Sequence, residues 1–139
     1  DFGNKLAHVS RHFPLSFHPK AQDSAEATEC AAEIGGEQAF WKMRAAIFAA
    51  MPDMPLTDLP KIAAAQGVNE AKFKTCLDSN KHEKKVKDQL SEGSTAGVAA
   101  TPTTVVYDMK TGKTQLIEGA VPYDQQKTTV ESFIKQQEG

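Results

Sequence analysis

The sequence predicts one α/β domain in which a long helical segment separates two parts that contain β-structure. Residues 1–19 hold an alternating apolar stretch and a loop, and residues 20–96 carry helical apolar periodicity. Residues 97–139 hold a β-branched run and a hairpin connection before a last helix. A chain of 139 residues has the length of one domain. The expected order is therefore a strand, four or five helices, a β-hairpin and a helix.

The first β-element is predicted over Lys5–Phe13. Apolar and polar residues alternate there, with Leu6 on one face and Val9 on the other. Pro14 and Pro19 bracket the loop that follows, because proline breaks a regular ladder.

The first two helices are separated by a glycine pair. Lys20–Ile34 is rich in alanine and places Cys30 on its apolar face, and Gly35-Gly36 ends it. The next helix begins near Glu37 and is predicted to be well buried by a wide apolar face, made of Phe40, Trp41, Met43, Ile47 and Phe48.

Three shorter helices follow. Thr57 is expected to cap a helix over Asp58–Gln66, and Asn69 to cap the next one. That next helix carries Cys76 on its inner face, and Lys81–Glu92 forms a charged helix with a narrow apolar stripe.

The third part of the chain contains a β-hairpin. Thr103–Tyr107 and Thr114–Glu118 are rich in β-branched and apolar residues, and Gly112 lies in the turn between them. A final helix over Gln125–Gln137 is expected to be capped by Asp124.

Composition excludes several classes of partner. The formal net charge of -2 gives no electrostatic case for nucleic acid. No apolar run approaches the ~20 residues that span a bilayer.

His8 and His12 would lie ~13 Å apart on one face of a strand, too far to share an ion. We therefore expect no metal site, and all four histidines on the surface.

The two cysteines are Cys30 and Cys76, 46 positions apart. A redox thiol needs a helix N-terminus and a second thiol nearby, and neither cysteine has that setting, so no catalytic residue is expected in this chain. A structural disulfide and plain packing as small buried side chains both remain open.

Gly97–Tyr107 carries the sequence feature with the clearest functional meaning. A run of small residues ends in Thr101-Pro102 and passes directly into a β-branched strand. Proline fits the first residue of a strand, and X-Pro bonds adopt the cis form at a cost of roughly 0.5–1 kcal/mol. The loop is either an ordinary strand start or a segment that presents its backbone to a ligand.

Six segments together carry a family resemblance. In their order and spacing, the chain resembles the DsbA-like branch of the thioredoxin superfamily over nearly its whole length. The segments are Arg11–Pro19, Glu29–Glu33, Phe40–Met43, Phe73–Ser79, Gly97–Pro102 and Ile117–Pro122.

The resemblance implies a thioredoxin-like α/β fold of DsbA type with a helical insertion. This family carries a Cys-x-x-Cys motif on a strand-to-helix turn upstream of the equivalent of Lys5–Phe13, and no such motif occurs here. The N-terminal strand and helix are thus expected to be missing. The strand between Lys5–Phe13 and Thr103–Tyr107 is then absent, which leaves unpaired edges and predicts poor stability of the chain alone.

The resemblance also implies a function: thiol–disulfide exchange with extended or unfolded protein substrates, assisted by a redox partner protein and without a cofactor. The location implied is the periplasm or another extracytoplasmic space. Thr101 would bind a peptide through its backbone and Pro102 would be cis, while Cys30 and Cys76 would form a structural disulfide. Two alternatives stay open, a redox-inactive thioredoxin-like module that binds peptides or proteins and a glutathione-using relative.

Overall fold

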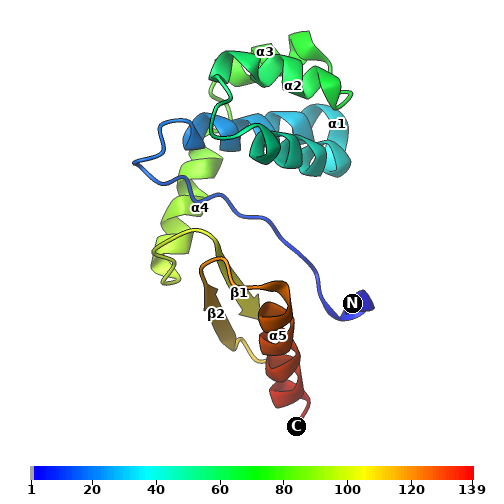
Figure 1. The fold of residues 1–139 in the computed structure, drawn as a ribbon, viewed down its shortest axis with the longest axis vertical. Coiled ribbons are helices and arrows are strands. Elements are labelled where there is room, and N and C mark those ends of the chain that lie inside the picture. The colour runs from blue at the N-terminus through cyan, green and yellow to red at the C-terminus, as the bar shows by residue number, and fades with distance from the viewer. Residues whose placement is uncertain (1) are drawn as a thin grey trace. The chain divides into compact units, whose positions relative to one another are not determined.

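The structure is a computed structural model, and it describes residues 2–139. Contacts divide it into two compact units, one ending at Glu92 and one over Gly93–Gly139, which are described separately. Figure 1 shows the elements, which in chain order are η1 (Gly3–Lys5), α1 (Ala21–Ala50), η2 (Leu56–Asp58), α2 (Leu59–Ala65), α3 (Glu70–Asp78), α4 (Glu83–Thr95), β1 (Thr103–Tyr107), β2 (Thr114–Glu118) and α5 (Tyr123–Glu138).

The first unit is built on helix α1, against which α2 and α3 pack. Met43 of α1, Leu59 of α2 and Phe73 of α3 are fully buried, so each helix contributes a large side chain to one core. Apolar residues at helical spacing produce this arrangement, because each helix must bury one stripe.

Helix α1 contains the break that the sequence predicts. Gly36 has φ +76° and ψ -171°, a backbone conformation that glycine adopts most readily. The helix is therefore kinked at this residue. The apolar face beyond the kink is narrower than predicted, because Met43 and Ile47 are buried while Phe48 is 64% exposed, with the Arg44 guanidinium 4.8 Å from its ring centre.

One of the three predicted helix caps is confirmed. The Asn69 side chain accepts a hydrogen bond of 2.9 Å from the Lys72 backbone N–H at the start of α3. Thr57 lies inside η2 and does not cap α2, which η2 leads into directly. Asp124 lies within α5, which begins after Pro122 without a side-chain cap. Helix α5 starts earlier than the predicted Gln125, at Tyr123, whereas α2 starts at Leu59, just after the predicted Asp58, because the 3₁₀ turn η2 occupies the residues before it.

The Asn69 cap gives a first testable prediction. Asn69→Ala leaves an N–H of α3 without its side-chain acceptor, so we expect the free energy of unfolding to fall by about 1 kcal/mol. Urea unfolding followed by circular dichroism measures the change. Thr57→Ala is the matched control, and a loss at Thr57 equal to that at Asn69 would contradict the assignment.

The strand predicted over Lys5–Phe13 is wrong. A 3₁₀ turn over Gly3–Lys5 comes first, and the residues after it form no ladder. A strand requires a hydrogen-bonded neighbour, and among the described residues only β1 and β2 pair. Side chains of α4 hold the segment instead: Gln89 Oε1 accepts a hydrogen bond of 2.7 Å from the backbone N–H of His12, and Glu92 pairs with Arg11.

The second unit contains the predicted hairpin, which is confirmed with the predicted bounds. Strands β1 and β2 are antiparallel, and their register places Thr103 opposite Glu118 and Val106 opposite Gln115. The connecting turn contains Gly112 at φ +72°. A run of β-branched residues and a glycine turn are local features, which explains why the sequence predicts this element well.

Helix α5 covers one face of this hairpin. Gln126 Nε2 of α5 donates to Thr104 Oγ1 at 3.0 Å, so α5 lies on the face of β1 that carries Thr104 and Val106. The residues buried in this unit are Val106, Ile117, Val130 and Phe133. These residues form a small core between α5 and one face of the β1–β2 hairpin, as in a thioredoxin-like α/β fold.

Candidate functional site

The Thr101-Pro102 loop stands at the start of β1, as the sequence predicts. Both residues are exposed, and the peptide bond between them is cis. Two hydrogen bonds fix the loop: Thr103 Oγ1 donates to the Ala100 carbonyl at 2.7 Å, and the Gly119 N–H donates to the Pro102 carbonyl at 2.8 Å. The loop therefore continues the register of the hairpin by one residue pair.

The Pro102–Gly119 bond also decides which backbone groups of β1 face away from β2. In an antiparallel pair, hydrogen-bonded and non-hydrogen-bonded residues alternate. Because Pro102 faces Gly119 through a hydrogen bond, Thr101, Thr103 and Val105 direct their backbone groups to the opposite edge. Among residues 2–139, no strand pairs with that edge. An exposed loop thus leads into a strand edge that is open to an added strand.

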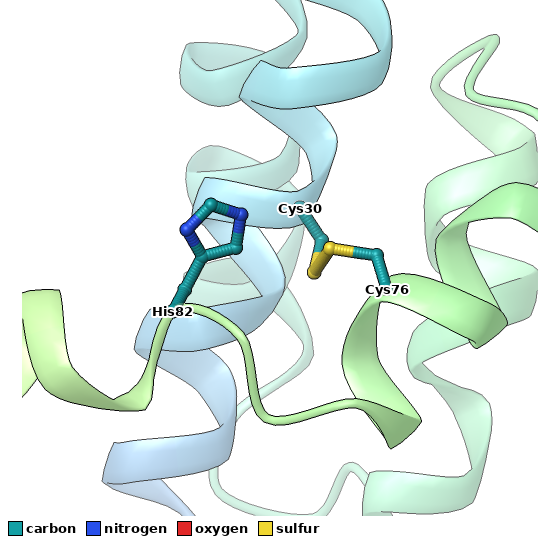
Figure 2. A group of neighbouring side chains, drawn as sticks. All are labelled: Cys30, Cys76 and His82. Atoms are coloured by element: carbon teal, nitrogen blue, oxygen red, sulfur yellow. A yellow bond between two sulfur atoms is a disulfide. The ribbon is translucent and has the colours of Figure 1, made fainter.

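The second cluster surrounds Cys30 and Cys76, which form a disulfide between α1 and α3 with a Cα–Cα distance of 5.9 Å. Neither sulfur is a free thiol, and both residues are buried. Figure 2 shows the ring of His82 facing this disulfide from the turn between α3 and α4. The apolar positions of Cys30 and Cys76 on their helices permitted this bond, and the structure forms it.

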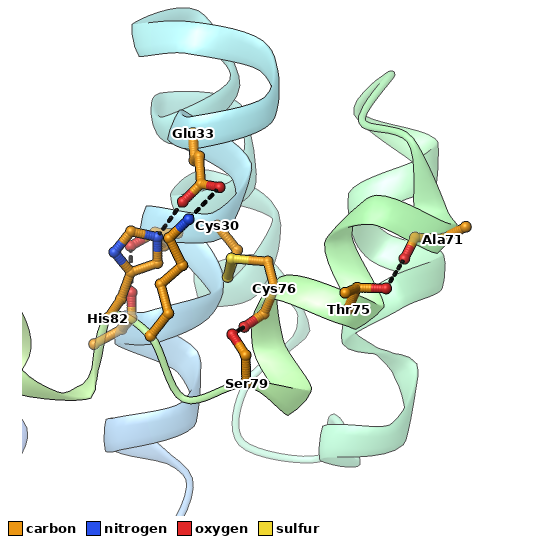
Figure 3. The surroundings of a disulfide bond; sticks show 10 residues. Cys30, Glu33, Ala71, Thr75, Cys76, Ser79 and His82 are labelled. Carbon is orange, nitrogen blue, oxygen red and sulfur yellow. Dashed lines mark hydrogen bonds and ion pairs between the residues drawn. A yellow bond between two sulfur atoms is a disulfide. The ribbon is translucent and has the colours of Figure 1, made fainter.

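Charged side chains lie next to the disulfide (Figure 3). Glu33 Oε2 is 2.9 Å from His82 Nε2, and Lys81 Nζ donates to Glu33 Oε1 at 2.8 Å. These hydrogen bonds, the one from Lys81 foremost, hold the pKa of the Glu33 carboxyl below its usual value. Beside this group lies an open depression of about 590 Å³ that Cys76 helps to line.

A third cluster is a buried ion pair that the sequence did not predict. Glu29 Oε1 is 2.8 Å from His12 Nε2, and Lys85 Nζ donates to Glu29 Oε2 at 2.5 Å. An ionised carboxylate only accepts hydrogen bonds, so His12 is the donor. The hydrogen bond from His12 lowers the pKa of Glu29 to about 2; Lys85 adds to this effect, and burial opposes it.

The surface placement predicted for the histidines is wrong at two positions. The side chain of His12 is 10% exposed and that of His82 is 17% exposed, because each packs against a glutamate of α1. The partners lie 17 and 49 residues away along the chain. No local pattern marks such pairs. The weak indication available was two glutamates, Glu29 and Glu33, beside Cys30 on an otherwise alanine-rich helix.

Comparison with known proteins places the chain in a family. A family model described as thioredoxin matches residues 2–132. The crystal structure of Pseudomonas aeruginosa DsbA2 superposes with a TM-score of 0.75 and 28% identity, over 90% of this chain and 70% of that one.

Curated relatives carry a different name. The Na(+)/H(+) antiporter NhaA 1 of Mycolicibacterium gilvum is 35% identical over 108 residues, which are 76% of this chain and 17% of the antiporter. NhaA 3 of Salinispora tropica is 32% identical over 99 residues, 70% of this chain and 15% of that protein. The chain thus spans about a sixth of these relatives. None of the helices described over residues 2–139 has the length and apolar character to cross a membrane.

The helical unit, the β-hairpin with its covering helix, the family match over nearly the whole chain and the DsbA2 superposition agree with one another. The chain belongs to the thioredoxin family, in its DsbA-like branch.

Proposed function

We propose that this chain acts in thiol–disulfide exchange on extended protein segments, with the Thr101-Pro102 loop and the free edge of β1 as the docking surface. The observation that carries the proposal is the Gly119–Pro102 hydrogen bond. It sets which residues of β1 bond to β2, and it thereby leaves the backbone groups of Thr101 and Thr103 facing an unpaired edge. A bound peptide would add a strand there, and its main chain would supply most of the affinity.

The exchange chemistry itself requires a second pair of cysteines. Cys30 and Cys76 are bonded to each other and buried, so they do not provide the exposed thiolate that attacks a substrate disulfide. A redox-active pair would have to come from residues outside these 139. The bonded cysteines favour an oxidising, extracytoplasmic location for the protein, with a partner protein that restores the redox state of the active pair.

A peptide titration tests the docking surface. Val105→Pro removes an N–H from the free edge of β1, where proline is tolerated because no ladder bond is lost. With a fluorescently labelled, reduced and alkylated unfolded polypeptide, we expect about fivefold weaker binding, the equivalent of one backbone hydrogen bond of about 1 kcal/mol. Fluorescence anisotropy reports the affinity.

Leu116→Pro is the matched control for that variant. Leu116 lies opposite Val105, so its N–H faces the outer edge of β2, and the two side chains are similarly exposed at 37% and 42%. We expect this variant to bind the polypeptide as the unmodified chain does. Equal binding by all three chains, or equal losses in both variants, would contradict docking at the edge of β1.

A redox-inactive peptide-binding module is the second candidate, because both cysteines of the sequence are used in one buried disulfide. The two functions separate in an insulin-reduction assay on the intact protein. Turnover supports the oxidoreductase, whereas peptide binding at the β1 edge without turnover supports the binding module.

A further inference from the structure

We propose that reduction of the Cys30–Cys76 disulfide converts its surroundings into a Zn²⁺ site. Its ligands would be the two thiolates, the His82 imidazole and the Glu33 carboxylate. The two sulfurs and a ring nitrogen of His82 all lie within 4.8 Å of one another. Thiolate sulfur and imidazole nitrogen are the donors that zinc prefers, in four-coordinate tetrahedral sites.

Formation of the zinc centre requires a local movement of the ligand side chains. Zn–S bonds of about 2.3 Å and Zn–N bonds of about 2.0–2.1 Å in a tetrahedron place two sulfurs about 3.8 Å apart and sulfur about 3.6 Å from nitrogen. The two sulfurs, which are bonded to each other in the disulfide, must therefore move apart after reduction, and the His82 nitrogen must approach them by up to about 1 Å. The Cα atoms of the two cysteines are 5.9 Å apart, so both side chains can reach one ion.

Glu33 would supply the fourth ligand by turning its carboxylate toward the sulfurs, because among the described residues the ligand atoms within 4.8 Å of one another belong to Cys30, Cys76 and His82 alone. It lies three residues after Cys30, so both side chains share one face of α1. Its Oε2 is 2.9 Å from His82 Nε2, close to the oxygen–nitrogen separation of about 3.3 Å between two ligands of one zinc ion.

The charges also balance. Two thiolates, one carboxylate and Zn²⁺ sum to one negative charge, and the Lys81 ammonium, 2.8 Å from Glu33, offsets it. Cys30 is 1% and Cys76 is 7% exposed, so the thiolates would be shielded from solvent, while the Glu33 side chain, 38% exposed, would lie on the open side of the centre.

The conversion needs a reductant, for which we name a dithiol or a phosphine. The reductant gives two electrons to the Cys30–Cys76 bond, which breaks to two thiols. A dithiol supplies both protons and closes to its own disulfide, whereas a phosphine takes the oxygen of a water molecule, becomes its oxide and leaves the two protons of the water on the sulfurs. Each thiol loses its proton when zinc binds, so two protons leave per ion. Oxidation would release the metal, which makes binding depend on the redox state of this disulfide.

Cobalt(II) titration tests the proposal, because Co²⁺ takes the same ligands and its thiolate charge-transfer bands report bonds to sulfur. The 139-residue chain is reduced with a phosphine, which is then removed under anaerobic conditions. We expect one equivalent of Co²⁺ to bind with thiolate bands, Zn²⁺ to displace it, and the oxidised chain to show no bands. Absence of bands in the reduced, folded chain, or zinc binding unaffected by oxidation, would overturn the site.

Matched variants separate the ligands from their neighbours. His82→Ala and Glu33→Gln are expected to weaken zinc binding by about 10- to 100-fold, whereas the exposed His18→Ala and Glu37→Gln leave it unchanged. Equal affinities across all four variants would contradict the assignment of His82 and Glu33. If reduction unfolds the chain, zinc must restore its helical circular dichroism, because metal binding is then coupled to folding. Failure of zinc to do so also overturns the site.

Discussion

The double variant Cys30→Ser/Cys76→Ser is expected to lose about 4 kcal/mol of its free energy of unfolding. The disulfide closes a loop of 46 sequence steps, and in the chain-entropy model such a cross-link removes that much conformational freedom from the unfolded chain. Domains of this size are stable by only about 5–15 kcal/mol, so the bond supplies a large share of the total.

Urea unfolding with and without a phosphine reductant measures this loss. At a slope of about 2 kcal/mol per molar urea, 4 kcal/mol moves the midpoint by about 2 M. Reductant should move the midpoint of the unmodified chain by the same amount and leave that of the double variant where it is. Metal-free buffer with a chelator keeps any zinc binding from masking the effect.

A second double variant, with alanine at both positions, controls for changes in packing. Serine adds a hydroxyl at two buried positions, so Cys30→Ala/Cys76→Ala should show a similar loss if the cross-link dominates. A reduced chain with two alkylatable thiols and an unchanged midpoint would show that the bond contributes nothing to stability.

Local sequence features predicted the second unit and much of the first. The bounds of β1 and β2, the kink at Gly36 and the Asn69 cap all follow from residues within a few positions of one another. Periodicity, glycine freedom and side-chain caps act over that range, so one sequence is enough to place them.

Features that depend on distant partners were not predictable in the same way. Lys5–Phe13 alternates as a strand should, but whether it pairs depends on a neighbour supplied from elsewhere in the fold. The burial of His12 and His82 likewise depends on where α1 places Glu29 and Glu33. Titratable clusters assembled from separate segments leave no periodic trace in the sequence, and the candidate zinc ligands share this property.

The second large effect is expected at Glu29. Its pKa is lowered from 4.5 to about 2, chiefly by the hydrogen bond from His12, and this shift corresponds to about 3 kcal/mol of stability. The sign follows from the direction of the shift. The folded state holds the carboxylate charged more strongly than the unfolded chain does, so the contribution is complete above about pH 4.5. It declines as the pH falls through the window down to about 2.

Urea unfolding of the unmodified chain and of Glu29→Gln, repeated between neutral pH and about pH 2, checks this expectation. The variant keeps the shape of the side chain and cannot ionise. It should be about 3 kcal/mol less stable at neutral pH, and the difference should shrink toward zero at the acidic end. Glu37→Gln, an exposed position on the same helix, should show no such pH-dependent difference.

The pH profile separates the ion pair from simple packing. If Glu29 only filled space between α1 and α4, a glutamine side chain at this position would serve equally well, and the two curves would coincide at every pH. If the charge matters through His12, then His12→Ala should remove most of the pH-dependent difference in a double-mutant cycle with Glu29→Gln, because the main donor is gone. A difference that persists at full size in that background would assign the effect to Lys85 instead, whose ammonium is the second donor at 2.5 Å.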